Sequence, residues 1–308
     1  MKKIRLSKYF VTLLVLVLGL SVGASFYFFH VAQVRAEKSF ISNGQRSKND
    51  PLYSYDQAFD NLPKTTKKMT NQGLKQVAWY VPAAKKSNKT AIIVHGFANS
   101  KANMKAYAWM YHQMGYNVLM PDNMAHGQSQ GSLIGYGWND RLNVIKWTKL
   151  LAKDHPNDQI TWFGLSMGAA TVMMASGENV PKQVSAIVED CGYSSVWDEL
   201  KFQAKEMYHL PAFPILYEVS LLSKIRAGFS YKEASSVKQL GKNKIPMLFI
   251  HGSKDDFVPT SMVYDSYHAT KGPKGLYIVK GAKHARSFQT KPKAYQEHIE
   301  RFLRKYVK

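Results

Sequence analysis

From about residue 76 onward, the chain alternates between short apolar segments and longer amphipathic ones. The short segments are rich in β-branched and aromatic residues and predict strands at about 76–81, 91–95, 117–121, 159–163, 185–189, 246–250 and 275–280. The longer segments predict helices at about 101–114, 138–153, 167–176, 236–240, 260–270 and 292–306. Strands that alternate with helices in this way indicate a mostly parallel sheet with helices on both faces.

The alternation is interrupted once, between the strands predicted at 185–189 and 246–250. The interval includes the aromatic, proline-containing stretch MYHLPAFPILYEVSLL at 207–222. Because structureless loops of this length are rare in compact domains, we predict an inserted helical cap at about 192–235. Two ordinary surface helices are the alternative. A second membrane span is not expected, since the uncharged run within the stretch is far too short.

The N-terminal part of the chain has a different pattern. Residues 10–29 carry no charge, and their number matches an α-helix that crosses a bilayer. Four basic residues precede this run: Lys2, Lys3, Arg5 and Lys8. Positive charge next to a membrane span tends to stay in the cytoplasm. We therefore predict a single-pass cell-membrane protein with its main domain outside, in which residues 1–36 form a basic stub and a transmembrane anchor.

Two further expectations concern this region. Tyr27, Phe28 and Phe29 are expected at the outer membrane interface. The alternative to an anchor is a signal peptide that is cleaved before Glu37, which would release a secreted protein.

The polar segment 37–74 is interpreted as a tether followed by a short entry segment. Its aromatic residues Tyr53, Tyr55 and Phe59 are expected to dock onto the domain formed by 75–308.

Composition narrows the functional classes. The single cysteine, Cys191, excludes an internal disulfide and a CxxC metal or redox site, and it is expected to be a small buried residue. The formal charge of +21 favours attraction to anionic cell-surface polymers or lipids. Nucleic acid is not an expected partner, because the basic residues are scattered and form no recognisable binding motif.

The candidate nucleophile lies in the sequence Gly164-Leu165-Ser166-Met167-Gly168, between an apolar strand and a helix-forming run. A G-x-S-x-G pattern is weak alone but specific in strand–turn–helix context. The turn around Ser166 is tight, and side chains two residues before or after the serine would collide, so glycine is required there.

A serine hydroxyl needs a base, and the base needs an orienting acid. The acid is expected in IHGSKDDFVP, at the end of the strand 246–250, where Asp255 and Asp256 are both candidates, and Asp190 is a further alternative. The best candidate for the base is His284, in the loop GAKHARSF after the last strand. Acyl transfer also needs backbone N–H donors for an oxyanion, and Phe97 and Met167 are placed to supply them. His95 is expected to brace the turn that carries Phe97.

Taken together, HGFANS, PDNMAHGQSQG, GLSMG, IHGSKDDFVP and GAKHA resemble the α/β-hydrolase superfamily over about residues 75–306. The similarity is greatest to exported or membrane-anchored bacterial hydrolases of the prolyl-oligopeptidase-like and BEM46-like branches. The resemblance implies the α/β-hydrolase fold, with Ser166 as nucleophile, Asp255 as acid, His284 as base, and the amides of Phe97 and Met167 as oxyanion hole. It implies no metal and no organic cofactor.

One position departs from the family pattern. Met124-Ala125 replaces the usual Arg-Gly of the P-D-x-R-G-H-G turn, a change that affects packing of the turn rather than the reaction class.

The sequence thus predicts an extracytoplasmic serine hydrolase that cleaves small or medium carboxylic esters through an acyl-enzyme. A peptidase or aminopeptidase of the same fold is the alternative within the class. A non-catalytic surface-binding protein that kept the fold is the alternative from another class.

Overall fold

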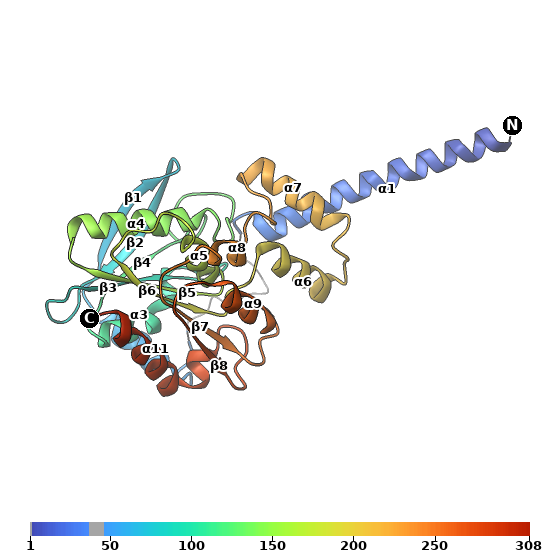
Figure 1. The fold of residues 1–308 in the computed structure, drawn as a ribbon. Helices are drawn as coiled ribbons and strands as arrows, with labels where there is room; N and C mark the ends of the chain where they lie inside the picture. Colours follow the sequence, from blue (N-terminus) through green and yellow to red (C-terminus); the bar gives the residue numbers. More distant parts are fainter. Residues whose placement is uncertain (1, 37–45) are drawn as a thin grey trace.

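The computed structural model describes residues 2–36 and 46–308, so the expected tether at 37–45 lies outside the described residues. Its central element is an eight-stranded sheet in the order β1-β2-β4-β3-β5-β6-β7-β8 (Figure 1). The strands are β1 (Thr65–Asn71), β2 (Leu74–Val81), β3 (Lys89–Val94), β4 (Asn117–Pro121), β5 (Gln159–Leu165), β6 (Val184–Asp190), β7 (Met247–Gly252) and β8 (Lys274–Val279).

The sheet is parallel from β4 to β8, while β1 and β2 join it as an antiparallel hairpin. The mostly parallel sheet expected from the alternating pattern is therefore confirmed. β1 was not expected, and the sheet begins earlier than the boundary predicted at residue 75. The reason is that β1 is an edge strand with exposed lysines, whose only buried side chain is Met69, and such a strand carries little apolar signal.

Helices cover both faces of the sheet, as expected. One face carries α2 (Tyr53–Asp60), the 3₁₀ helix η1 (Lys101–Met104), α3 (Lys105–Gln113), α10 (Ser287–Thr290) and α11 (Pro292–Tyr306). The other face carries α4 (Asp140–Asp154), α5 (Met167–Ala175), α8 (Ser236–Leu240) and α9 (Ser261–Ala269). Phe59 of α2 is fully buried in the first of these layers, so this aromatic residue does dock onto the domain.

The insertion after β6 contains two helices, α6 (Val196–Tyr208) and α7 (Ile215–Ala227), which stand beyond the end of the sheet (Figure 1). They pack with α1 (Lys2–Gln33) around a third apolar cluster that includes Phe29, Leu216 and Phe229. We call α6, α7 and the turn between them the cap.

Helix α1 is long and apolar enough between Tyr9 and Gln33 to cross a membrane, by length and composition. Its first part projects away from the domain, and its last part lies along α7 (Figure 1). The expected interfacial positions divide: Tyr27 is 59% exposed, whereas Phe28 is half-buried and Phe29 is 1% exposed. Phe28 and Phe29 pack against protein, and their place at the outer membrane interface stays a prediction.

Candidate active site

Ser166 lies on a strained turn between β5 and α5. Its backbone has φ 56° and ψ −115°, a conformation that non-glycine residues rarely adopt. The two flanking glycines make this turn sterically feasible. A Cβ at Gly164 would meet the backbone of Gly168, and a Cβ at Gly168 would meet the backbone of Val94. The spacing of glycines around Ser166 therefore has the steric cause inferred from the sequence.

His284 and Asp255 come from two different loops and meet at Ser166. His284 follows β8, and its Nε2 lies 2.8 Å from the Oγ of Ser166. Its Nδ1 lies 2.9 Å from the Oδ2 of Asp255, which follows β7. An ionised carboxylate accepts a hydrogen bond from the protonated Nδ1, which leaves Nε2 as acceptor for the serine hydroxyl. The structure thus brings together the three side chains selected from the sequence.

The Asp255 carboxylate is held by several donors. Its Oδ1 accepts hydrogen bonds from the backbone amides of Phe257 and Val258, at 3.0 and 2.9 Å. Burial alone would raise the pKa of Asp255, but hydrogen bonds from His251 and His284 outweigh it and lower that pKa below its ordinary value. Asp255 is therefore ionised across the physiological range.

The two alternative acids lie elsewhere. Asp256 is exposed and lies 3.5 Å from Lys283. Asp190 is buried and accepts a hydrogen bond from the hydroxyl of Tyr295 at 2.8 Å. Among the described residues, the carboxylate that hydrogen-bonds His284 is that of Asp255.

His251 is a neighbour of the site that sequence reasoning missed. This buried residue near the end of β7 places its Nε2 3.2 Å from Oδ2 of Asp255 and 2.9 Å from the carbonyl of Val258. Burial alone would lower the pKa of His251, but the hydrogen bond and charge of Asp255 outweigh it and raise that pKa. The signal was available, since His251 precedes Gly252 at the end of the strand that delivers the acid.

The expected amide donors lie on the other side of Ser166. Met167 is the first residue of α5, so its N–H has no acceptor within the helix. Phe97 lies in the turn after β3, where a Cβ on Gly96 would come within 3.4 Å of the Cβ of Ser166. This turn therefore packs directly against the candidate nucleophile.

Two histidines brace that turn. His95 accepts a hydrogen bond from the amide of Asn123 at 2.9 Å. His126 accepts one from the amide of Ala98 at 3.1 Å, and burial together with His95 lowers the pKa of His126 to about 3. A neutral His126 is what this acceptor role requires, and the turn is fixed by side chains that carry no charge.

Cys191 lies beside the same residues. Its sulfur and ligand atoms of Asp255 and His284 lie within 4.8 Å of one another. The thiol is fully buried, and burial raises its pKa well above the ordinary value. Cys191 is therefore a small buried residue, as expected, and the donor atoms of Asp255 and His284 are already engaged with each other.

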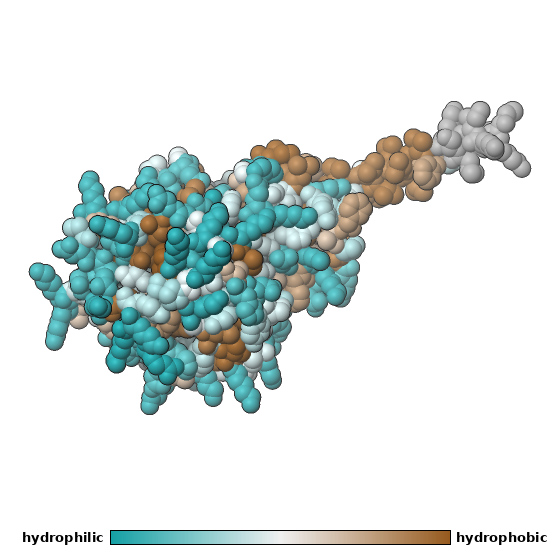
Figure 2. Space-filling view, in the orientation of Figure 1, coloured by the Kyte–Doolittle hydropathy of each residue, from teal (hydrophilic) through white to brown (hydrophobic). Residues whose placement is uncertain are grey.

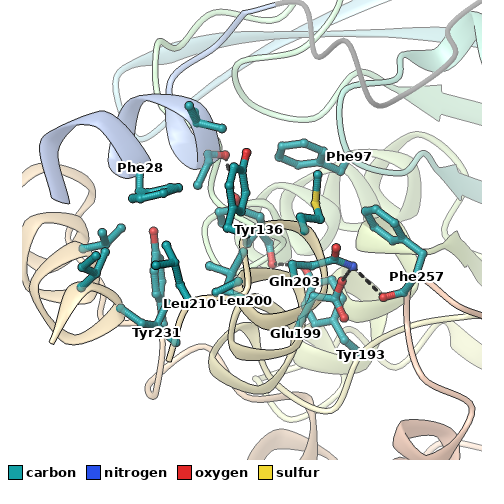
Figure 3. Close-up of a pocket in the computed structure, with 18 of the residues that line it drawn as sticks. Phe28, Phe97, Tyr136, Tyr193, Glu199, Leu200, Gln203, Leu210, Tyr231 and Phe257 are labelled. Atoms are coloured by element: carbon teal, nitrogen blue, oxygen red, sulfur yellow. Dashed lines mark hydrogen bonds between the residues drawn. The ribbon is translucent and has the colours of Figure 1, made fainter. Parts of the chain in front are cut away.

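An apolar cavity opens in front of Ser166, between the sheet edge and the cap (Figure 3). Its walls come from distant parts of the chain: Phe28, Val31 and Ala32 of α1; Phe97, Tyr136, Met167, Phe257 and Val258 of the main domain; and Leu200, Ala204, Met207, Tyr208, Leu210, Pro211, Ile215, Leu216 and Val219 of the cap. Phe97 stacks on Tyr136, with ring centroids 5.5 Å apart.

A single carboxyl group lines this cavity in the described part of the chain, that of Glu199 on α6. One of its oxygens accepts from Nε2 of Gln203 at 2.9 Å, and Gln203 also donates to the carbonyl of Phe257 (Figure 3). Burial raises the pKa of Glu199 to about 8, so the group is mostly protonated at neutral pH.

This chain is similar to known proteins both in sequence and in fold. A family model described as serine aminopeptidase, S33, matches residues 85–210, a stretch that contains Ser166 and ends before Asp255 and His284. The Bacillus subtilis protein YqkD is 29% identical over 248 residues, which are 80% of this chain and 81% of that protein.

Two solved structures are similar to the fold. The Pyrococcus furiosus esterase Pf2001 matches with a TM-score of 0.64 and 23% identity, covering 82% of this chain and 96% of that one. The Pyrococcus horikoshii acylaminoacyl peptidase matches with a TM-score of 0.63 and 17% identity, covering 82% of this chain and 43% of that one.

Proposed function

We propose that this chain, which has the α/β-hydrolase fold, is a serine hydrolase that cleaves carboxylic esters on the outer side of a cell membrane. The observation that carries the proposal is the chain of contacts from Ser166 through His284 to Asp255, with separations of 2.8 and 2.9 Å. Three side chains from separate loops meet in the geometry that activates a hydroxyl group.

The reaction follows from this geometry. The Oγ of Ser166 attacks the acyl carbon while its proton passes to Nε2 of His284. Asp255 keeps Nδ1 protonated and stabilises the imidazolium that forms. The amides of Phe97 and Met167 stabilise the tetrahedral oxyanion. The imidazolium then protonates the leaving alcohol, and the acyl group stays on Ser166.

Release of the acyl group repeats the steps with water. His284 takes a proton from the water, whose oxygen attacks the acyl carbon, and then returns the proton to Oγ of Ser166. The residues supply a nucleophile, a base, an acid and an oxyanion hole, so this mechanism uses no cofactor.

The lining of the cavity favours an ester. Aromatic and aliphatic side chains surround Ser166, and they suit an acyl chain better than the charged end of a peptide. The esterase Pf2001 has a similar fold, which is consistent with this choice. A peptidase is the second candidate, because a carboxyl group at Glu199 is able to bind an amine if it ionises.

We propose that the catalytic domain lies on the outer side of the membrane, because basic residues precede the apolar helix α1 and such residues tend to stay in the cytoplasm. The positive charge of the whole chain is suited to anionic polymers or lipids at the cell surface.

An active-site fluorophosphonate probe tests the proposal, together with p-nitrophenyl esters of graded acyl length and aminoacyl p-nitroanilides. We expect the probe to label the wild type and not Ser166→Ala, and we expect ester hydrolysis to fall at least 10³-fold in that variant, as loss of a nucleophile typically causes. Well-folded wild type that neither binds the probe nor cleaves any ester would instead favour a non-catalytic binding protein.

A further inference from the structure

The polar side chains near the end of α1 face the cap. Ser21 and Ser25 donate hydrogen bonds to the carboxylate of Glu218 on α7, at 2.9 and 2.6 Å. Gln33 is fully buried and donates to the hydroxyl of Ser223 at 3.1 Å. These hydrogen bonds join the end of α1 to the folded cap, which a helix that served only as an anchor or a cleaved signal would not need.

The same face of α1 is a wall of the cavity at Ser166. Phe28, Val31 and Ala32 line it, and the ring of Phe28 meets that of Tyr208 edge to face at 5.0 Å. The carbonyl of Ala32 accepts a hydrogen bond from the hydroxyl of Tyr136 at 2.6 Å. Removal of α1 would open this side of the cavity.

A row of exposed apolar side chains runs along α7 and the turn before it. Phe213, Tyr217, Leu221 and Ile225 recur every four residues and are 74%, 47%, 60% and 71% exposed. We call these four residues the α7 stripe. None of them lines the cavity. Figure 2 shows apolar surface over α7 that continues along α1.

The length of α1 indicates where a bilayer would lie relative to the α7 stripe. A hydrocarbon core of about 30 Å takes about 20 helical residues, so a span that begins at Tyr9 ends close to Phe28. Phe28 lines the cavity, and its ring meets that of Tyr208 on the cap. This wall of the cavity therefore lies close to the level where the span leaves the hydrocarbon core. The start of α7 lies deeper, in the outer part of the span, where Ser21 and Ser25 hydrogen-bond the carboxylate of Glu218.

We propose that the α7 stripe lies in the outer leaflet of the bilayer that α1 crosses, and that the cavity takes the acyl chain of a lipid ester directly from this bilayer. The bilayer is the occupant that fits the stripe, because the stripe continues the apolar surface of α1 and the chain as a whole is strongly basic. The inference rests on the proposed function, since it names the substrate class of the same site.

The test uses the full chain in vesicles of ether-linked phosphatidylcholine and phosphatidylglycerol that contain monooleoylglycerol as the only ester. Release of oleate from the vesicles is compared with hydrolysis of soluble p-nitrophenyl butyrate. The variant combines Phe213→Ser, Leu221→Ser and Ile225→Ser. The matched control combines Leu150→Ser and Tyr264→Ser on α4 and α9, which are 37% and 42% exposed.

We expect the stripe variant to release oleate at least tenfold more slowly than wild type, with butyrate hydrolysis unchanged. Flotation should find it on the vesicles, since α1 is intact, and the control variant should match wild type in every assay. Ile225→Asn alone tests the same surface with one substitution and should give a smaller loss that is equally selective for oleate.

Three results would overturn the inference: equal oleate release by stripe variant and wild type, an equal loss in the control variant, or an Ile225→Asn variant that loses both activities together. Wild type that cleaves butyrate but releases no oleate would also overturn it and leave the proposed function standing. Wild type that cleaves neither ester would contradict the proposed function itself.

Discussion

Glu199 places a carboxyl group inside an otherwise apolar cavity, and its protonation state decides what that cavity accepts. Burial raises the pKa of Glu199 to about 8, and its second oxygen has no hydrogen-bond partner among the described residues. While it is protonated, the cavity is neutral and suits an acyl chain. When it ionises, the cavity carries a negative charge and suits an amine.

This residue gives a prediction with a clear pH dependence. From pH 7 to 9.5 we expect the KM of wild type for a medium-chain p-nitrophenyl ester to rise several-fold, because Glu199 ionises through about 8. Glu199→Gln should keep a low KM across this range, and Glu206→Gln, an exposed position on the same helix, should behave as wild type. Loss of aminoacyl anilide cleavage in Glu199→Gln, with ester cleavage retained, would instead favour the peptidase.

The stability effect of Glu199 has a definite sign. Its pKa in the folded state lies above the ordinary value of 4.5, so the folded protein retains a proton that the unfolded chain releases. This group therefore lowers the free energy of unfolding as pH rises from about 4.5 to about 8. Chemical denaturation of wild type between pH 4.5 and about 8 measures this effect, and Glu199→Gln should show a flatter dependence of the free energy of unfolding on pH.

At the scale of single elements, α1 allows a comparison between two phenylalanines three residues apart. Phe29 is 1% exposed and packs in the cluster with Leu216 and Phe229, whereas Phe26 is 51% exposed. We expect Phe29→Ala to lower the free energy of unfolding by about 3 kcal/mol and Phe26→Ala to leave it nearly unchanged. Denaturation of the detergent-solubilised full chain measures both. Equal small effects would mean that α1 contributes nothing to the folded domain.

The same helix shows where sequence reasoning stops. Its apolar residues predicted a membrane span. However, the residue types that face lipid in such a helix are the same as those that face protein. Phe28 and Phe29 were therefore assigned to the membrane interface, and the sequence did not reveal that both also pack against the cap. The elements around Ser166 were easier to predict, because a tight strand–turn–helix leaves no room for a Cβ at 164 and 168, and glycine at both positions is visible in the sequence.

The residues of the site also differ in how far the sequence could predict them. Ser166 and His284 could be chosen from chain order, since each follows a strand of the parallel sheet at the same edge, whereas the family resemblance selected Asp255 over Asp256. His251 and Glu199 could not, because a histidine near the end of a strand and a glutamate on a helix are usually structural or exposed. His251 reaches the acid because β7 ends beside Asp255. Glu199 reaches the cavity because α6 packs over it.

At the scale of the whole molecule, helix α1, the cap and the sheet share one cavity, and this leads to a prediction for a shortened chain. A protein that begins at Glu37, as signal cleavage would produce, lacks Phe28, Val31 and Ala32 and exposes the apolar faces of α7 that α1 covers. We expect residues 37–308 to cleave p-nitrophenyl butyrate, to lose the preference of the full chain for longer acyl groups, and to melt at a lower temperature. Mass spectrometry of the protein from its own cells should accordingly find the residues of α1 still attached. If the mature protein instead begins at Glu37 and matches the full chain in stability and acyl preference, α1 is a signal and its place in the cavity has no role in function.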